Sequence, residues 1–362
     1  MKTHINRTLL IAVLYLIGHC VILAQVPYPG CPNVSSRPVN TGLPFVNDTV
    51  TLPCSDNCVD LQANFLNTGQ TTSYGVSSIP YAPPFPFTGG TPIFTNQDDI
   101  FSGIINLPFN FCFYGQTYNR VVVGANGLIS FNTGRANGDC CYFCQNPLPR
   151  NQDANCNLGI SGNGNMYWNS INGAFHDLDP SVGGTISYSI IGSAPCRTFV
   201  VSFNNVPHYS CNNLTTTQQI VLYETTNVIE IYIRQKPSCP GWEDGNACVG
   251  IQNNNGTQGI APPGRNTSAW TANNEAWRFT PNGPANFVIT WKDPSGAVIG
   301  NNPTVNVCPP SFPAKYSVQI EYTNCDGQRI IESDTTVVNQ LKVTGTVSPD
   351  TTICAGDTAN LR

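Results

Sequence analysis

The stretch QQIVLYETTNVIEIYI, residues 218–233, decides the fold class. It holds two runs of β-branched and aromatic residues, separated by turn-forming residues at Thr225 to Asn227. In the returning run the isoleucines share one face and the other side chains share the opposite face: Ile229, Ile231 and Ile233 against Glu230, Tyr232 and Arg234. This alternation with a period of two residues predicts a hairpin whose second arm is a half-buried antiparallel strand.

Similar hairpins are predicted on the N-terminal side of this stretch. RVVVGANGLISF, residues 120–131, places two strand-forming runs around an Asn-Gly turn at Ala125 to Gly127. GTISYSII and RTFVVSF, residues 184–191 and 197–203, form a second pair around Gly192 to Pro195. Helical periodicity is almost absent. Many short strands with such turns predict an all-β protein built from antiparallel sandwiches, with a barrel as the alternative.

The chain divides near TPNGPANF, residues 280–287. The strand-like runs that follow predict a smaller module with the size of an immunoglobulin-like (Ig-like) or PKD-like bead. The final stretch, VSPDTTICAGDTANLR, cannot bury a core by itself. We therefore expect a signal peptide over residues 1–24, a large β-rich domain over 25–283, a small Ig-like sandwich over 284–346, and the start of a further, truncated repeat over 347–362.

Residues 1–24 carry Lys2, Arg7 and the apolar run LLIAVLYLIGHCVILA, which is typical of a cleaved secretory signal. A retained membrane anchor is the alternative, although the run is shorter and more interrupted than a bilayer span requires. No later stretch is long and apolar enough to span a membrane. The chain has 16 cysteines, a formal net charge of −5 and only 10% charged residues. These values favour an oxidising compartment and argue against nucleic acids or anionic lipid surfaces as partners.

The cysteines are expected to form disulfides. Cys54 is close enough in sequence to pair with Cys58, and Cys308 with Cys325 across the small module. Cys354 is left without a partner if the last module is truncated. The cluster CCYFCQNPLPRNQDANC also allows a zinc site, although its spacing departs from paired Cys-x2-Cys motifs. That alternative involves Cys140, Cys141, Cys144 and Cys156.

The stretch GAFHDLDPSVGGTISY, residues 173–188, is the strongest candidate for a site. His176 lies beside Asp177 and Asp179, but no nucleophile-elbow sequence accompanies it, so catalysis is not expected. Two readings remain. Asp177 and Asp179 supply part of a calcium shell, or they hold a tight turn before a strand over Thr185 to Ile190. The turn is favoured because Asp-Pro and Gly-Gly bracket the loop. No cofactor other than calcium is expected.

Several stretches together resemble a known family. AFHDLDPSVGGTISYSI, RTFVVSFNNV, TTTQQIVLYETTNVIEIYI and ACVGIQNNNGTQ follow the order of a nidogen-like extracellular module, and NEAWRFTP resembles its last strand. With FNFCFYGQTYNRVVVGANGLISF ahead of them, they also resemble the N-terminal region of large secreted adhesin-like proteins of Bacteroidetes. In such proteins Ig-like or PKD-like repeats follow, and a type B sorting domain of the gliding-motility-associated (type IX) secretion system ends the chain. SPDTTICAGDTANL is similar to the opening of such a repeat.

The resemblance implies a secreted or cell-surface, adhesin-like protein without catalytic activity in this chain, whose partner is an extracellular protein or glycan. The alternative is a carbohydrate-binding region of a larger degradative enzyme. Loop aromatics that could line a sugar site support this alternative: Tyr142, Phe143, Trp168, Trp242 and Trp270. A hydrolase within this chain is the least favoured reading.

Overall fold

The computed structural model describes residues 29–39, 42–94, 97–140, 142, 146–150, 168–342 and 356. Within them the chain forms strands β1 to β23 and two short 3-10 helices, with no α-helix. The predicted all-β class is therefore confirmed. No helix among these residues is long and apolar enough to cross a bilayer. The expected signal peptide lies outside the described residues.

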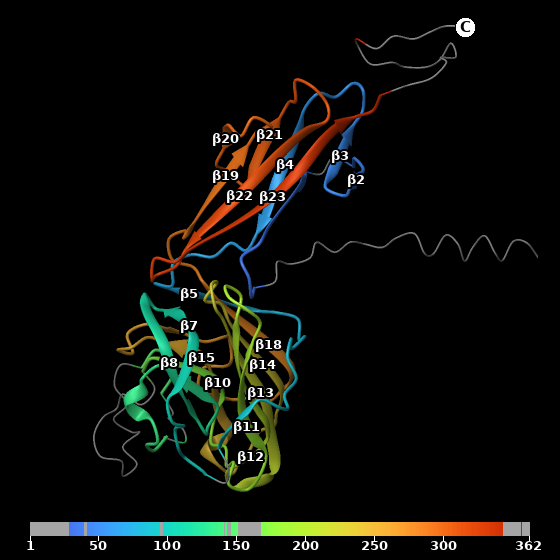
Figure 1. Cartoon of the computed structure of the whole chain (residues 1–362). Helices are drawn as coiled ribbons and strands as arrows, with labels where there is room; N and C mark the ends of the chain where they lie inside the picture. Colours follow the sequence, from blue (N-terminus) through green and yellow to red (C-terminus); the bar gives the residue numbers. More distant parts are fainter. Residues whose placement is uncertain are drawn as a thin grey trace, which may run out of the picture.

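Two β-sandwiches form the molecule, and we call them the large and the small sandwich. Figure 1 shows them at opposite ends of the chain's fold. The large sandwich consists of two seven-stranded sheets. Its first sheet has the order β16-β15-β10-β9-β8-β7, with β17 paired to β15. Its second sheet has the order β5-β18-β14-β13-β12-β11-β6.

The strands of the first sheet are β7 (Ile105–Phe113), β8 (Gln116–Gly124), β9 (Leu128–Ser130), β10 (Ser170–Phe175), β15 (Asn246–Gln252), β16 (Gly259–Ile260) and β17 (Ser268–Ala269). Those of the second are β5 (Tyr74–Ser78), β6 (Thr91–Phe94), β11 (Thr185–Ile191), β12 (Thr198–His208), β13 (Cys211–Tyr223), β14 (Ile229–Lys236) and β18 (Ala272–Pro281). The 3-10 helices η1 (Thr133–Arg135) and η2 (Glu243–Gly245) lie in connections.

The three predicted hairpins are confirmed. Gly124 pairs with Leu128 across the Asn-Gly turn between β8 and β9. Strands β11 and β12 pair along their length, as do β13 and β14. Local turn chemistry is enough to fix these pairings because each partner follows within a few residues.

The core of the large sandwich lies between its sheets. Alternate residues of β13 and β14 enter this core, among them Ile220, Leu222, Ile229, Ile231 and Ile233. The opposite face of β14 was expected to meet solvent, which is confirmed at Arg234 and wrong at Glu230 and Tyr232. Glu230 and Tyr232 are only 1% and 4% exposed. A second apolar layer that includes parts of residues 66–85 covers this face of the sheet.

The small sandwich packs a three-stranded sheet, β1-β4-β21, on a six-stranded sheet, β2-β3-β23-β22-β19-β20. Trp291, Val318 and Ile320 are fully buried in its core. Its strands are β1 (Val34–Pro38), β2 (Phe45–Val46), β3 (Thr49–Leu52), β4 (Val59–Phe65), β19 (Phe287–Lys292), β20 (Val298–Gly300), β21 (Thr304–Val307), β22 (Ala314–Thr323) and β23 (Arg329–Gln340).

The expected start of the large domain at residue 25 is wrong. Strands β1 to β4 belong to the small sandwich, where β4 pairs with β1 and β21 and β3 runs parallel to β23. The large sandwich is thus inserted between β4 and β19 of the small one. The expected boundary at 283/284 lies between β18 and β19. Most of the segment expected to begin a further repeat, residues 347–362, lies outside the described residues.

The two crossings between the sandwiches run side by side. Gly69 forms a β-bridge with Ala285, and further backbone hydrogen bonds link the crossings at Gln70 with Pro284 and Gly283. A Cβ on Gly69 would lie 2.1 Å from the carbonyl oxygen of Gly283, so these backbones meet only because both residues are glycine. The junction is therefore a two-stranded connection.

The disulfides differ from the expected pairs. Cys58 bonds to Cys308 because Val59 and Val307, the next residues toward the strands, are directly paired in β4 and β21. Cys325, in the turn after β22, bonds to Cys112 of β7. The expected pairs Cys54–Cys58 and Cys308–Cys325 are thus wrong, although Cys54 is also disulfide-bonded.

Two further disulfides join described residues. Cys31 bonds to Cys196 and Cys211 bonds to Cys239. Cys31–Cys196 and Cys112–Cys325 both join the inserted large sandwich to residues outside it. Cys354, expected to be unpaired, lies outside the described residues.

Candidate metal site

The loop that contains His176 follows β10 and leads into β11. Asp179 holds the turn: its Oδ1 accepts hydrogen bonds from the backbone N–H and the hydroxyl of Ser181. Its own N–H donates to the carbonyl of Pro207 at 2.8 Å. This is an Asx-type turn, in which the carboxylate replaces a backbone acceptor. The structure therefore gives Asp179 the turn role.

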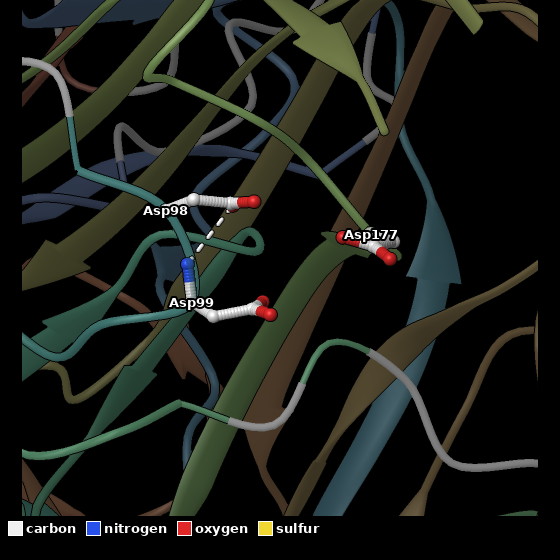
Figure 2. A group of neighbouring side chains, drawn as sticks. All are labelled: Asp98, Asp99 and Asp177. Atoms are coloured by element: carbon white, nitrogen blue, oxygen red, sulfur yellow. Dashed lines mark hydrogen bonds between the residues drawn. The ribbon is translucent and has the colours of Figure 1, made fainter. Parts of the chain in front are cut away.

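Asp177 has a different environment. Its Oδ2 accepts a 2.7 Å hydrogen bond from the indole N–H of Trp242, while its Oδ1 is buried without a hydrogen-bond partner. One carboxylate oxygen each from Asp177, Asp98 and Asp99 lies within 4.8 Å of the others. Figure 2 shows the three carboxylates pointing toward a common space.

Asp98 and Asp99 come from the connection between β6 and β7. The Asp98 carboxylate accepts a hydrogen bond from the N–H of Asp99, whose backbone is in the left-handed region with φ of 48°. Asn126, in the Asn-Gly turn after β8, donates from its amide nitrogen to Asp99 at 2.8 Å. The Asn126 side-chain oxygen accepts from the N–H of Leu178 at 2.9 Å. Asn126 thus fixes both halves of the carboxylate cluster relative to each other.

The electrostatics of this cluster are unfavourable without a counter-charge. Burial, followed by the charge of Asp99, raises the pKa of Asp177 to about 8. Burial and the charge of Asp99 likewise raise the pKa of Asp98 to about 7. No described lysine or arginine forms a salt bridge with any of the three. Oxygen donors without a basic partner are the donor set that hard cations such as Ca²⁺ and Mg²⁺ bind.

The two histidines of the described chain lie next to this cluster and contact a buried threonine. The His176 and His208 rings are 4.3 Å apart, and both Nε2 atoms contact the hydroxyl of Thr216. Burial lowers the pKa of both. The cavity beside them has a volume of about 10 Å³, which holds no more than one water molecule.

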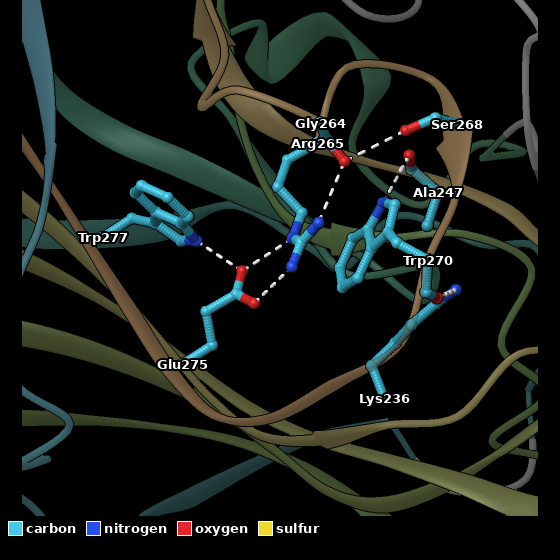
Figure 3. Close-up of polar contacts among 8 residues, drawn as sticks. All are labelled: Lys236, Ala247, Gly264, Arg265, Ser268, Trp270, Glu275 and Trp277. Atoms are coloured by element: carbon cyan, nitrogen blue, oxygen red, sulfur yellow. Dashed lines mark hydrogen bonds and ion pairs between the residues drawn. The ribbon is translucent and has the colours of Figure 1, made fainter.

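The loop aromatics do not form one surface. Trp270 is 7% exposed. The Nζ of Lys236 lies 4.6 Å from the centre of its ring, and the guanidinium of Arg265 lies 4.7 Å from it (Figure 3). Arg265 also forms a salt bridge with Glu275. Trp168 donates its indole N–H to the carbonyl of Arg150. These two tryptophans therefore anchor loops.

A smaller aromatic group remains beside the carboxylates. The Trp242 ring lies 4.8 Å from that of Tyr209 and 6.1 Å from that of Tyr142, and Tyr209 is 41% exposed. Phe143 lies outside the described residues. Of the cysteines considered for zinc, Cys140 is buried in an apolar cluster, whereas Cys141, Cys144 and Cys156 lie outside the described residues.

Sequence reasoning missed Asp98 and Asp99, and it named Trp242 and the Asn126 turn without connecting them to this site. The two aspartates precede Asp177 by almost 80 residues, so no local spacing links them. The only signal was an Asp-Asp pair in a chain with few charged residues.

The family was determined from comparison with known proteins. A family model described as NIDO related matches residues 73–292, which is more than half of the chain. No curated protein and no solved structure gives a significant match. The matched segment contains every strand of the large sandwich and excludes β1 to β4. The chain belongs to the nidogen-related (NIDO-related) family.

Proposed function

We propose that this chain is a secreted or cell-surface, adhesin-like interaction protein that has no catalytic activity. The observation that carries the proposal is the junction: two sandwiches joined by paired crossings and by the disulfide Cys112–Cys325. A fixed pair of modules is suited to presenting a binding surface away from its point of attachment. A cleft of about 500 Å³ opens at this junction, lined among others by Gln70, Asn227, Phe287 and Asn324.

The location outside the cytosol is supported by chemistry as well as by family. The nidogen-related domain is an extracellular type of module, and disulfides persist in oxidising compartments. The finer part of the proposal is that the small sandwich is an Ig-like or PKD-like repeat. Export by the type IX route, as in the adhesin-like proteins of Bacteroidetes, belongs to the same finer proposal.

The absence of catalysis is proposed because the described site lacks the needed partners. A nucleophilic device requires a histidine beside a nucleophile in a space that admits substrate. His176 and His208 are instead buried against Thr216, beside a cavity of about 10 Å³.

Carbohydrate binding is the second candidate function, and one observation favours it. Tyr142, Tyr209 and Trp242 form an aromatic group at the surface beside polar side chains. Aromatic rings next to hydrogen-bonding groups are typical of surfaces that stack against sugars.

Binding experiments separate the two candidates. The oxidised chain is tested for binding to a glycan array and, coated on beads, for adhesion to cells and matrix proteins. We expect adhesion without turnover of polysaccharide, ester or peptide substrates. Glycan binding that Trp242→Ala and Tyr209→Ala both abolish would favour the second candidate. Turnover of any of these substrates that is retained on extensive purification would refute the non-catalytic proposal.

A further inference from the structure

We propose that Asp98, Asp99 and Asp177 bind one Ca²⁺ ion. The cluster's mutual distances suit this ion: oxygens bound to the same Ca²⁺ at about 2.3–2.6 Å lie no more than about 5 Å apart. The three ligand atoms here all lie within 4.8 Å of one another. Each carboxylate can supply at least one oxygen, and waters can complete a calcium shell of about six to eight oxygens.

A second observation, separate from the clustering, is the state of Asp177. This residue is 6% exposed, and its Oδ1 is buried without any hydrogen-bond partner. Trp242 fixes the orientation by donating to Oδ2, so Oδ1 cannot turn to a protein donor without breaking that bond. A buried acceptor without a partner is costly unless a ligand satisfies it. Figure 2 shows the Asp177 carboxylate directed toward Asp98 and Asp99.

Among the described residues, the contacts of this cluster fix its geometry but include no salt bridge. Asn126, fully buried, holds Asp99 through a neutral amide and holds the Asp177 loop through the N–H of Leu178. Neither contact reduces the repulsion among the carboxylates. A divalent cation does reduce it, and Asp98 and Asp99 are only partly buried.

The donor set favours calcium over other metals. All candidate ligands are carboxylate oxygens, whereas zinc and copper sites rely on imidazole or thiolate. The nearby imidazoles of His176 and His208 are not part of the cluster, and their Nε2 atoms contact Thr216. Magnesium binds fewer protein carboxylates and retains several waters, so a closely spaced triple-aspartate site suits the larger ion.

Calcium at this position links three distant parts of the large sandwich. Asp98 and Asp99 precede β7, Asp177 follows β10, and Trp242 precedes η2. An ion that binds only the folded arrangement raises the melting temperature in proportion to the logarithm of its concentration above Kd.

The full oxidised chain is treated with chelator, dialysed, and melted over a series of CaCl₂ concentrations. We expect Tm to rise with the logarithm of the CaCl₂ concentration, by about 5 °C or more over the series, and calorimetry should give one saturable site per chain. Asp177→Asn and Asp99→Asn should remove both signals. Asp293→Asn is the matched control, since Asp293 accepts hydrogen bonds in an exposed turn of the small sandwich; it should keep the calcium response unchanged.

The Asp177→Asn variant should still fold, so a missing calcium response can be attributed to the site. Without calcium, Asp177→Asn keeps the shape of the side chain and adds no charge to a repulsive cluster, so its Tm should equal or exceed that of the calcium-free wild type. Terbium luminescence gives an independent reading: Trp242, in contact with Asp177, should sensitise bound Tb³⁺, and added Ca²⁺ should quench it. A wild type whose Tm does not rise with Ca²⁺ and whose calorimetry shows no site, or an Asp177→Asn variant with the full response, overturns the proposal.

Discussion

At the scale of single residues, this protein treats two buried carboxylates in opposite ways. Glu230 accepts hydrogen bonds from the hydroxyls of Tyr223 and Tyr232 and pairs with Arg278 at 2.7 Å. Asp177 has one indole donor and an oxygen without a partner. A buried carboxylate requires partners that compensate its charge. The protein itself supplies these partners to Glu230, whereas the proposed calcium ion would supply the missing partner of Asp177.

Replacing Glu230 with Ala should therefore be strongly destabilising. The change leaves Arg278 and two tyrosine hydroxyls without their acceptor, and breaking such a buried pair costs about 3–5 kcal/mol. Guanidinium chloride unfolding of the oxidised chain measures this cost. Glu321→Ala is the matched control, because Glu321 pairs with Arg329, whose side chain is 65% exposed. That variant should lose less than about 1 kcal/mol. Equal losses in the two variants would contradict the prediction.

His208 should make stability depend on pH on the acid side. Burial, followed by the charge of Lys236, lowers its pKa from 6.5 to about 4. The groups facing it are Lys236 and the ring of His176. The unfolded chain therefore takes up the proton first, so the contribution of His208 is fully present above pH 6.5 and is lost as pH falls toward 4. The loss amounts to roughly 3 kcal/mol.

His208→Gln measures this contribution, because glutamine keeps a polar atom near Thr216 but does not titrate. The difference in unfolding free energy between wild type and variant is recorded from pH 8 to pH 4, which cancels the titration of the carboxylates common to both. Wild type should lose stability relative to the variant over this range. Parallel pH profiles would show that the folded-state pKa of His208 is not lowered.

At the scale of elements, the two sheets of the large sandwich are joined by a glutamine. Gln218 of β13 is fully buried; its Oε1 accepts from the N–H of Ala174 in β10, and its Nε2 donates to the Ala174 carbonyl at 3.2 Å. A Cβ on Gly173 would lie 2.3 Å from Gln218 Oε1. The inter-sheet contact thus depends on glycine at this position.

Gly173→Ala should cost about 2–4 kcal/mol, from overpacking and from loss of the Gln218 hydrogen bonds. Gly241→Ala is the control: nothing lies within 4 Å of its added Cβ, so stability should change little. In a Gln218→Ala background the cost of Gly173→Ala should shrink, because the clashing atom is gone. Additive losses in the double variant would place the clash elsewhere.

Elements are also where sequence reasoning succeeded and failed. The Asn-Gly turn before Leu128 and the turn after Tyr223 fixed their hairpins, since each pairing is decided by the residues between the strands. The Glu230 face of β14 was misjudged because the covering layer comes from residues 66–85, far away in the chain. The site was half found for the same reason: Asp177 was identified, but Asp98 and Asp99 reach it only through the fold.

At the scale of the whole molecule, long-range pairings control the architecture. Three of the disulfides in the described chain join residues separated by 165, 250 and 213 positions. Pairing by proximity in sequence therefore misassigned Cys58 and Cys308. The insertion of the large sandwich was not predicted for the same reason: β4 pairs with β21, and the whole large sandwich lies between these two strands in the sequence.

The disulfide between Cys112 and Cys325 should govern how firmly the two sandwiches are joined. It connects β7 of the large sandwich to the turn after β22 of the small one, beside a hydrogen bond from Asn227 to Asn324. Replacing both cysteines with Ser should leave each sandwich folded while the crossings at residues 66–73 and 282–286 become accessible. Limited proteolysis should then cut these crossings faster, and small-angle scattering should show a wider distribution of shapes.

The disulfide Cys211–Cys239 provides the matched comparison, because both of its cysteines lie within the large sandwich, 28 residues apart. Its removal should lower the stability of that sandwich by about 2–4 kcal/mol without faster cleavage at the crossings. Comparing the two variants separates an effect on the junction from a general loss of stability. If removal of Cys112–Cys325 leaves both proteolysis and scattering unchanged, the paired crossings and the disulfide Cys31–Cys196 are enough to hold the modules together. Part of the rigidity on which the proposed adhesive function depends would then come from Gly69 and Gly283, whose close backbone approach no other residue permits.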